Sequence, residues 1–406
     1  MATTEFRPVG NGLAAVQGLK ATGLACGIKA NGKLDLALVV ADRPAAVAAT
    51  FTTNRVQAAP VRLSRRHLLG GRLAAIILNS GNANACTGAQ GRADAEATAA
   101  AAAEALGCPL RQVFVASTGV IGRPMPMANV LAGIREAATQ LSRRGARLAA
   151  QAILTTDNGP KEAGVSFRAG GRRVTVAGFC KGAGMIAPRM ATMLAVVATD
   201  AAISSHLLRQ ALRPAVAESF NCVTVDGDTS TNDTVFCFAT GAAGAPAIEA
   251  GTAAFRTFQA ALTRTCRALA RMIARDGEGA TKLAAVRLCG ARSAAEAARA
   301  ARTVAESPLV KTTLFGEDMN WGRIMAALGR SGARFDPEAV DIAVDGLPVV
   351  RRSMSLGPAA EARANRRLRR REFGLEIDLH AGRGEAQMWT TDLTEAYVRI
   401  NAGYRS

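Results

Sequence analysis

The chain has 406 residues, of which 49% are hydrophobic and 20% are charged, with a formal net charge of +18. This composition is ample for a buried core and too poor in charge for a disordered polyelectrolyte. The longest apolar stretch, 190–199, lies between Arg189 and Asp200 and is far short of the ~18 residues of a membrane helix. Domains of roughly 100–200 residues predict two structural units, or three.

In the first half of the chain, short apolar runs alternate with alanine-rich stretches, which is typical of a mixed α/β protein. We expect buried strands at 37–40, 74–78 and 113–115. A helix is predicted over 92–106, because acidic residues fall in its first turn and Gly107 follows its last residue.

The second half repeats this alternation. Apolar side chains recur every three or four residues over 255–273, which predicts a helix with one buried face. Ser293 and Glu296 form a capping box that opens another helix. Two more strands are predicted at 340–344 and 375–379 from their alternating pattern.

The positive charge comes almost entirely from arginine, since 43 of the 50 basic residues are Arg and seven are Lys. The densest run, 363–371, is interpreted as a solvated helix face or loop rather than a nucleic-acid patch. Aromatic residues make up only 4% of the chain, so few side chains are available to stack on bases. We therefore expect no nucleic-acid partner.

The chain start lacks the basic flank and apolar stretch of an export signal, so we expect a soluble protein of the cytoplasm, with no membrane partner. The eight cysteines have no metal-knuckle or CxxC spacing and are expected to be reduced. His67, His206 and His380 are far apart in sequence, which makes a histidine metal site or a Ser-His-Asp triad unpromising.

The glycine-rich segment 182–187 has two possible interpretations. Gly182, Gly184 and Ala187 match a dinucleotide-binding fingerprint with alanine in third place. However, Pro188 interrupts the helix that this motif requires, and the next strand begins near Met193. A crossover needs at least ten to twelve residues, so nucleotide binding is disfavoured.

The same segment fits a self-processing site between Ala191 and Thr192. A threonine at the first position of a buried strand could attack its own preceding carbonyl, and cleavage would free an α-amine beside the hydroxyl. Such an amine titrates near pH 7.7–8.0 and can serve as the general base of its own side chain. The alternative from spacing alone is a threonine that merely begins a strand.

Seven further segments accompany this one, at 79–88, 116–122, 155–157, 226–233, 276–282, 316–323 and 397–402. Together the eight ordered motifs resemble the ornithine acetyltransferase family, also called the glutamate N-acetyltransferases or ArgJ proteins. The resemblance extends over essentially the whole chain.

The resemblance implies an α/β (α+β) fold of the αββα sandwich type, related to self-processing aminopeptidases, with a second smaller α/β domain. It implies cleavage between Ala191 and Thr192 into an alpha chain, 1–191, and a beta chain, 192–406. Two alpha and two beta chains would assemble into a heterotetramer.

The implied reaction is acetyl transfer in arginine biosynthesis. Thr192 would take acetyl from N2-acetylornithine and pass it to glutamate, while the Thr118 hydroxyl and the Gly119 N–H stabilise the oxyanion. Some members of the family also use acetyl-CoA as donor, but this sequence carries no CoA-specific motif. No metal or organic cofactor is expected. Positions matching the family's substrate contacts are Thr155, Lys181, Thr192, Glu278, Asn401 and Ser406.

Two of the motifs can also be interpreted in another way. Segment 226–233 begins like a calcium loop, but its sixth position is Thr231 and its twelfth is Cys237, instead of Gly and Glu. We expect a hydrogen-bonded turn that supports the site. Glu317, Asp318 and Trp321 are expected to form a structural loop.

Two rival functions remain. A self-cleaving amidohydrolase or aminopeptidase with an N-terminal threonine would pass the acyl group to water and release acetate without glutamate. A basic nucleic-acid-binding protein would show salt-dependent DNA affinity and no self-cleavage.

Overall fold

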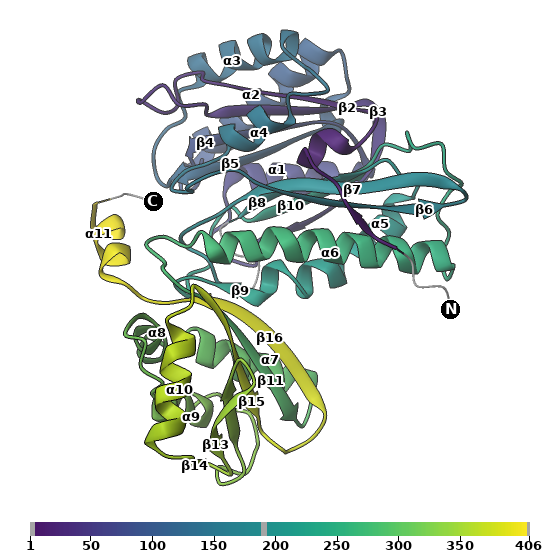
Figure 1. Cartoon of the computed structure of the whole chain (residues 1–406). Helices are drawn as coiled ribbons and strands as arrows, with labels where there is room; N and C mark the ends of the chain where they lie inside the picture. The colour runs from purple at the N-terminus through teal and green to yellow at the C-terminus, as the bar shows by residue number, and fades with distance from the viewer. Residues whose placement is uncertain (1–4, 188–192, 404–406) are drawn as a thin grey trace. The chain divides into compact units, whose positions relative to one another are not determined.

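The computed structural model describes residues 5–187 and 193–403, and the chain divides into two compact units (Figure 1). Within the described residues, the larger unit comprises 5–221 and 228–273, and the smaller comprises 222–227 and 274–403. Both units contain a sheet covered by helices. The predicted mixed α/β fold with a second, smaller domain is confirmed.

The larger unit is built on one nine-stranded sheet. Its strands are β1 (Arg7–Pro8), β2 (Leu19–Leu24), β3 (Leu36–Phe51), β4 (Arg72–Asn82), β5 (Val113–Val120), β6 (Lys161–Ala169), β7 (Arg172–Lys181), β8 (Leu194–Thr199) and β10 (Thr234–Ala239). The spatial order is β1-β6-β7-β8-β10-β3-β4-β5, with β2 also paired to β3.

The long strand β3 joins two layers of this sheet. Its first half pairs with β2, its second half pairs with β10, and its register with β4 shifts between Val40 and Ala45. Apolar side chains from both layers meet in one buried cluster, which includes Ile76 and Phe114 from one layer and Phe236 from the other. The two layers therefore pack face to face.

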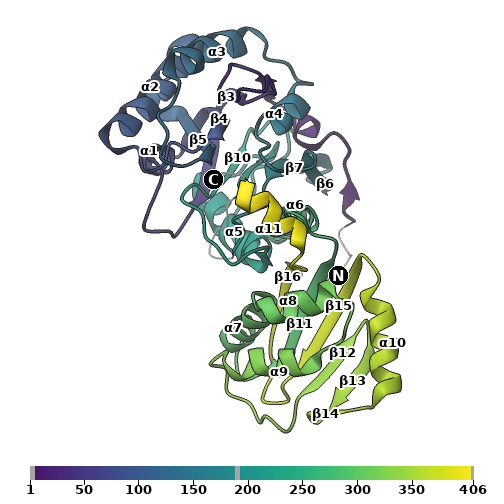
Figure 2. The same ribbon diagram turned by 90° about the vertical axis from the view of Figure 1, so that its left-hand side faces the viewer.

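Helices cover the outer faces of the two layers (Figures 1 and 2). On the side of β2–β5 lie α1 (Ala59–His67), α2 (Gly88–Leu106) and α3 (Met127–Thr139). On the other side lie α5 (Ser205–Ala217) and α6 (Ala253–Arg275), while α4 (Ala146–Ala152) adds alanines to the cluster between the layers. This arrangement is the αββα sandwich that the resemblance implied.

The smaller unit has a seven-stranded sheet in the order β14-β13-β12-β15-β11-β16-β9. Its strands are β9 (Val223–Thr224), β11 (Leu283–Ala291), β12 (Asp341–Val344), β13 (Leu347–Arg351), β14 (Met354–Ser355), β15 (Glu372–Asp378) and β16 (Gly384–Thr391). Its helices are α7 (Ala294–Ala305), α8 (Pro308–Phe315), α9 (Trp321–Gly329), α10 (Pro358–Leu368) and α11 (Glu395–Gly403). Short 3-10 helices along the chain are η1 (Gly12–Ala15), η2 (Leu68–Gly70), η3 (Leu110–Gln112) and η4 (Phe220–Cys222).

The predicted elements are present, but several boundaries differ: β3, for example, continues to Phe51, whereas the prediction ended at 40. Helix α2 begins at Gly88, four residues before the predicted start at 92. The two glycines of this first turn argue against a helix in the sequence. In the fold, a Cβ on Gly91 would lie 1.8 Å from the Thr87 hydroxyl, so the missing side chain permits the turn. The predicted cap is confirmed, because the Ser293 hydroxyl accepts the Glu296 N–H at 3.2 Å.

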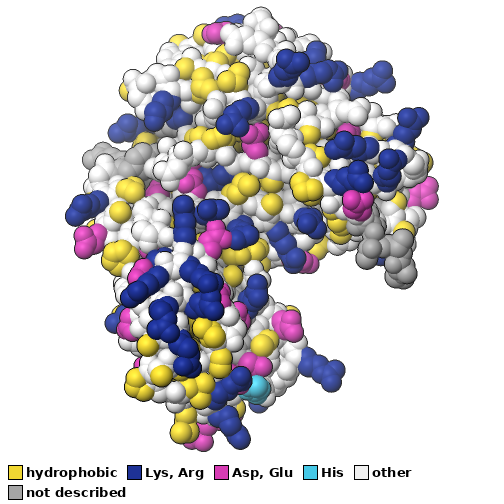
Figure 3. All heavy atoms as spheres, viewed as in Figure 1, with side chains coloured by type: hydrophobic (Ala, Val, Ile, Leu, Met, Phe, Trp, Pro, Cys, Tyr) yellow, Lys and Arg dark blue, Asp and Glu magenta, His cyan; other side chains and the backbone are white. Residues whose placement is uncertain are grey.

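The basic run at 363–371 begins on α10, whose Arg363 and Arg366 are exposed. This confirms the expected solvated helix face. Figure 3 shows basic side chains spread over the visible surface, interspersed with acidic and hydrophobic ones. None of the helices in the described ranges is long and apolar enough to cross a bilayer.

The aromatic contacts between the layers give a stability prediction. The ring of Phe236 lies 5.6 Å from that of Phe114 and 6.2 Å from that of Phe51, and Phe236 is fully buried. Phe236→Ala should therefore lower the free energy of unfolding by about 3–5 kcal/mol in urea titrations. Phe315→Ala on α8, where the ring is 43% exposed, is the control and should change it by less than about 1 kcal/mol. Equal losses in the two variants would contradict the assignment of this core.

Candidate active site

The predicted site residues of the larger unit gather at one end of the folded sheet. Four residues stand in register across it: Lys181 pairs with Leu194, Leu194 with Thr234, and Thr234 with Phe51. Neighbouring strands are ~4.8 Å apart. The end of β7 therefore lies beside the first residue of β8, which in turn lies beside the first residue of β10.

The loop 230–233 connects this sheet end to the other layer. The side-chain amide of Asn232 donates to the carbonyls of Ala83, at 2.6 Å, and Ser117, at 2.8 Å. The Thr52 hydroxyl at the end of β3 donates to the Ser230 carbonyl at 2.6 Å. The hydrogen-bonded turn predicted for 226–233 is thus confirmed in its second half, and it contacts the strand β5 one residue before Thr118.

Asp233 holds the start of β8. Its Oδ1 accepts the backbone N–H of Met193 at 2.9 Å, and the Thr234 N–H donates to the Met193 carbonyl at 3.1 Å. Asp233 is completely buried. Burial raises the pKa of its carboxyl well above the usual range, against the opposing effects of the Met193 N–H, the Lys181 charge and the Thr52 hydroxyl.

Thr118 and Gly119 lie at the end of β5, where β5 and β4 come very close. Thr118 is buried, and Gly119 has φ +131°, a conformation that favours glycine. A Cβ on Gly119 would lie 2.3 Å from the carbonyl carbon of Gly81. Only glycine fits between the strands here, so the backbone N–H of residue 119 is held by the sheet itself.

A buried carboxylate organises the other side of the site. Asp157 accepts hydrogen bonds from Lys161 Nζ at 2.6 Å, from the Gly182 N–H at 2.6 Å and from the Thr155 N–H at 3.1 Å. Lys181 Nζ lies 3.9 Å from its other oxygen. The three charged side chains are all at most 4% exposed.

The lysines determine the charge state of Asp157. Burial alone would raise the pKa of this carboxyl, but Lys181 and Lys161, with the hydrogen bonds from Lys161 and Gly182, lower it to about 2. Two ammonium groups thus lie within 4 Å of one buried carboxylate. Such a cluster suits the carboxylate group of a small ligand.

Lys29 ties this cluster to the loop between β2 and β3. Its Nζ donates to the carbonyls of Leu34, at 2.8 Å, and Leu154, at 2.7 Å, the residue before Thr155. Burial lowers the pKa of Lys29 to about 8, helped by Lys33 and Lys181 and opposed chiefly by Asp35. Lys29 therefore positions the segment that carries Thr155.

The smaller unit contains its own pair of predicted residues. The Asn401 amide on α11 donates to Glu278 Oε2 at 2.9 Å. The loop of Glu278 is held by buried Asp392, which accepts the backbone N–H groups of Thr281, at 2.9 Å, and Lys282, at 3.0 Å. Glu278 and Asn401, predicted from distant motifs, are thus in direct contact.

Three predicted site residues, Ala191, Thr192 and Ser406, lie outside the described residues. Met193 is the described residue nearest to the predicted nucleophile along the chain.

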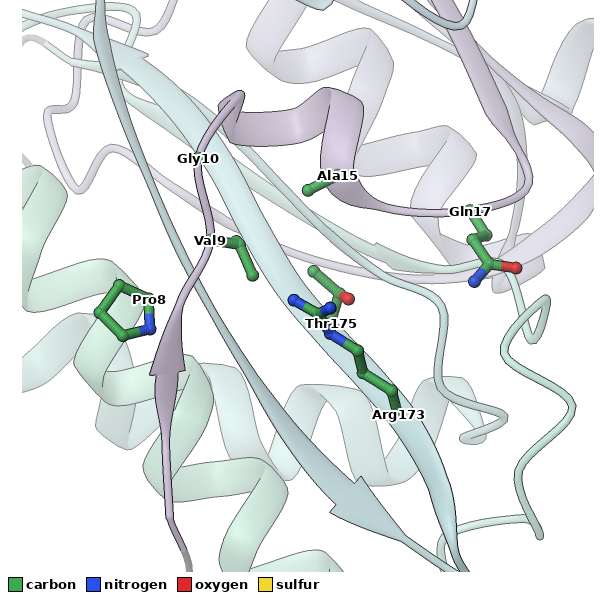
Figure 4. A pocket seen from close by; sticks show the side chains of 7 residues that line it. All are labelled: Pro8, Val9, Gly10, Ala15, Gln17, Arg173 and Thr175. Carbon is green, nitrogen blue, oxygen red and sulfur yellow. The ribbon is translucent and has the colours of Figure 1, made fainter.

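A separate hollow lies at the other end of β7 (Figure 4). It has a volume of about 330 Å³, and Arg173, Thr175 and Gln17 are among its lining residues. Thr175 and Lys181 are six residues apart on one strand, or roughly 20 Å. The hollow is therefore remote from the buried lysine cluster.

A comparison with known protein families shows to which family the chain belongs. A sequence model described as the ArgJ family matches residues 20–406. The chain belongs to the ArgJ family. The eight motifs that resembled this family all lie within the matched range.

Curated relatives carry the same family name. The arginine biosynthesis bifunctional protein ArgJ of Symbiobacterium thermophilum is 52% identical over 97% of this chain and 98% of its own length. The protein of that name from Geobacter sulfurreducens is 47% identical over 96% of this chain and 100% of its own. A solved structure of ornithine acetyltransferase complexed with ornithine, from Mycobacterium tuberculosis, is 44% identical, with a TM-score of 0.42, and covers 45% of this chain and 98% of its own.

The motif comparison missed four charged residues of this ArgJ-family site: Lys29, Asp157, Lys161 and Asp233. Asp157 and Asp233 stand inside two of the motifs, but neither was singled out. The lysines carry one weak signal, their rarity, since the chain has seven lysines and 43 arginines. Lysine and arginine are not interchangeable where a compact ammonium group is needed, but the exposed Lys20 and Lys33 are equally rare, so rarity alone does not identify the site.

The low pKa of Asp157 predicts a defined acid sensitivity. Because its folded pKa of about 2 lies below the unfolded value of ~3.9, the stability that it contributes is present above about pH 4 and is lost as the pH falls towards 2. Asp157→Asn should lower the thermal midpoint at pH 7, since it breaks a buried ion pair. It should also flatten the midpoint's decline between pH 4 and pH 2.

Asp42→Asn is the control for this measurement, because Asp42 forms a surface ion pair with Arg143 that is largely exposed. It should leave the acid limb unchanged. Parallel curves for the wild type and Asp157→Asn below pH 4 would show that Asp157 does not carry this linkage.

Proposed function

We propose that the chain is a self-cleaving acetyltransferase of arginine biosynthesis. It would move acetyl from N2-acetylornithine to glutamate through an ester on Thr192. Membership of the ArgJ family and the names of its curated relatives support this proposal.

One observation carries the proposal to particular residues: the loop 230–233 contacts both the strand of the predicted oxyanion donors and the first described residue after the predicted cut. Asn232 bonds to the carbonyl of Ser117, and Asp233 bonds to the N–H of Met193. The nucleophile's neighbour and the oxyanion strand are thus held by adjacent side chains. Such a rigid support is what acyl transfer requires of its nucleophile and oxyanion donors.

The transfer proceeds in two balanced steps. The Thr192 hydroxyl attacks the acetyl carbonyl, and its proton passes through the freed α-amine to the departing nitrogen of ornithine. The Thr118 hydroxyl and the Gly119 N–H stabilise the oxyanion. The amine of glutamate then attacks the ester, and N-acetylglutamate leaves as the threonine hydroxyl is restored.

The charged residues of each unit have a proposed role in substrate binding. Lys181, in the buried cluster around Asp157, binds an amino-acid carboxylate through its ammonium group, and the Thr155 N–H donates to the same Asp157. Glu278, oriented by Asn401, binds a charged amine of a substrate. Ser406 completes the set of contacts carried over from the family.

Three finer points belong to the proposal. The word bifunctional in the relatives' names favours acetyl-CoA as a second acyl donor. The cut chains assemble as two alpha and two beta chains. The enzyme works in the cytoplasm, where its amino-acid substrates are metabolites of the cell interior.

A self-cleaving N-terminal-threonine amidohydrolase or aminopeptidase is the alternative, because it shares the nucleophile. It differs in the acceptor. Acetate released from N2-acetylornithine at the same rate with and without glutamate would favour this alternative.

The first test of the proposal is the intact mass of the purified protein under denaturing conditions. We expect fragments of 191 and 215 residues, the second beginning Thr192-Met193-Leu194. Thr192→Ala should abolish both the cut and the transfer, because it removes the attacking hydroxyl. A single 42.0 kDa wild-type chain, or a Thr192→Ala chain that is still cut, would contradict the proposal.

A second test addresses Lys181. Lys181→Ala should raise the KM for glutamate by about 10- to 100-fold, the usual value of a hydrogen bond to a charged group, with a smaller effect on kcat. The matched control is Lys20→Ala, since Lys20 is an exposed lysine on β2. An unchanged KM in Lys181→Ala would remove this residue from the carboxylate site.

A further inference from the structure

Asp233 has an oxygen that no described group satisfies. Its Oδ1 accepts the Met193 N–H, but its Oδ2 is buried and receives no hydrogen bond from a described residue, because the nearby Thr52 hydroxyl donates to the Ser230 carbonyl instead. The side chain as a whole is completely buried. A buried carboxylate in this state is costly, and holding a proton is the ordinary way to reduce that cost.

The position of this carboxyl along the chain is specific. Met193 N, at 2.9 Å from Oδ1, is separated by three covalent bonds from the amide nitrogen of Thr192. That nitrogen is the atom that must leave the carbonyl of Ala191 if the chain is cut there. Asp233 is therefore a buried acid that is hydrogen-bonded to the residue directly after Thr192.

We propose that Asp233 is the proton carrier of the self-cleavage step, giving its proton to the Thr192 nitrogen as the bond to Ala191 breaks. This inference rests on the proposed function, because it needs the cut between Ala191 and Thr192. It assigns Asp233 a catalytic role that the motif comparison did not.

The step balances without any further reactant. The Thr192 oxygen bonds to the Ala191 carbonyl carbon, the C–N bond breaks, and the Asp233 proton goes to the nitrogen. The proton of the threonine hydroxyl restores Asp233. Water then hydrolyses the resulting ester, which gives a carboxylate at Ala191 and frees the threonine hydroxyl.

The same carboxyl has a use after cleavage. The new α-amine of Thr192 takes up a proton when it acts as general base, and a neighbouring ammonium group favours the ionised form of a carboxyl. A group that is neutral before the cut and anionic after it would serve both reactions.

The decisive variant is Asp233→Asn, which keeps an oxygen for the Met193 N–H but carries no transferable proton. The matched control is Asp200→Asn. Asp200 follows the last residue of the same strand β8, is 1% exposed, and accepts the backbone N–H of Thr175 at 2.7 Å. Both substitutions remove a buried carboxylate that bonds to backbone, at opposite ends of one strand.

The measurement is the fraction of uncut chain against time after synthesis, by denaturing mass spectrometry, with and without hydroxylamine. Hydroxylamine cleaves esters and leaves amides intact. We expect Asp233→Asn to be cut at least about 100-fold more slowly than the wild type, because general acid–base catalysis typically accelerates a reaction by about 100-fold or more. Hydroxylamine should not release fragments from it, because the ester does not form. Asp200→Asn should be cut at the wild-type rate.

Three results would overturn the inference. Asp233→Asn could be cut at the wild-type rate, or hydroxylamine could cleave it at Thr192, which would mean that the ester forms without Asp233. Its thermal midpoint could also fall far below that of uncut Thr192→Ala, which would assign Asp233 a structural role only. Failure of the proposed function is distinct, because it would appear as an uncut wild type or a cut Thr192→Ala chain.

Discussion

The hydrogen bonds of two adjacent side chains, Asn232 and Asp233, determine how the site of the larger unit is assembled. Asn232 holds the carbonyls of Ala83, which follows β4, and Ser117, which lies in β5 of the same layer. Asp233 holds Met193 at the start of β8 in the other layer. Neighbouring residues of one short loop cannot move far apart. The distance between the two halves of the site is therefore limited by covalent structure as well as by packing.

The buried charges place a second constraint on the fold. Desolvating Asp157 and two lysines is expensive, and it is offset only because the carboxylate receives hydrogen bonds from Lys161 and two backbone N–H groups. Those bonds hold the ends of several segments together, including the Gly182 segment that leads to the predicted cut. The charge that suits a substrate carboxylate is thus also part of what shapes its surroundings.

The compact units and the predicted cleavage fragments divide the chain differently. The predicted cut lies between β7 and β8, which are hydrogen-bonded antiparallel neighbours in the larger unit, whereas the main passage into the smaller unit comes after residue 273. A cut at Thr192 would therefore leave both fragments in one sheet, since β8 and β10 of the second fragment pair with β7 and β3 of the first. Such a cut would change the covalent ends inside the site and leave the sandwich paired.

The sequence by itself determined most secondary-structure elements and the family, because periodicity, caps and ordered motifs are local properties that a single chain displays. It indicated the strands, the helix over 255–273, the capping box at Ser293 and the motif residues of the site. It did not indicate the turn at 88–91, in which Gly91 is closely packed against Thr87. The contacts of Asn232 with residues more than 100 positions away, and the burial of Asp233 beside Met193, were decided only by the tertiary structure. Hydrogen bonding and desolvation depend on which groups meet in space, and no local pattern encodes that.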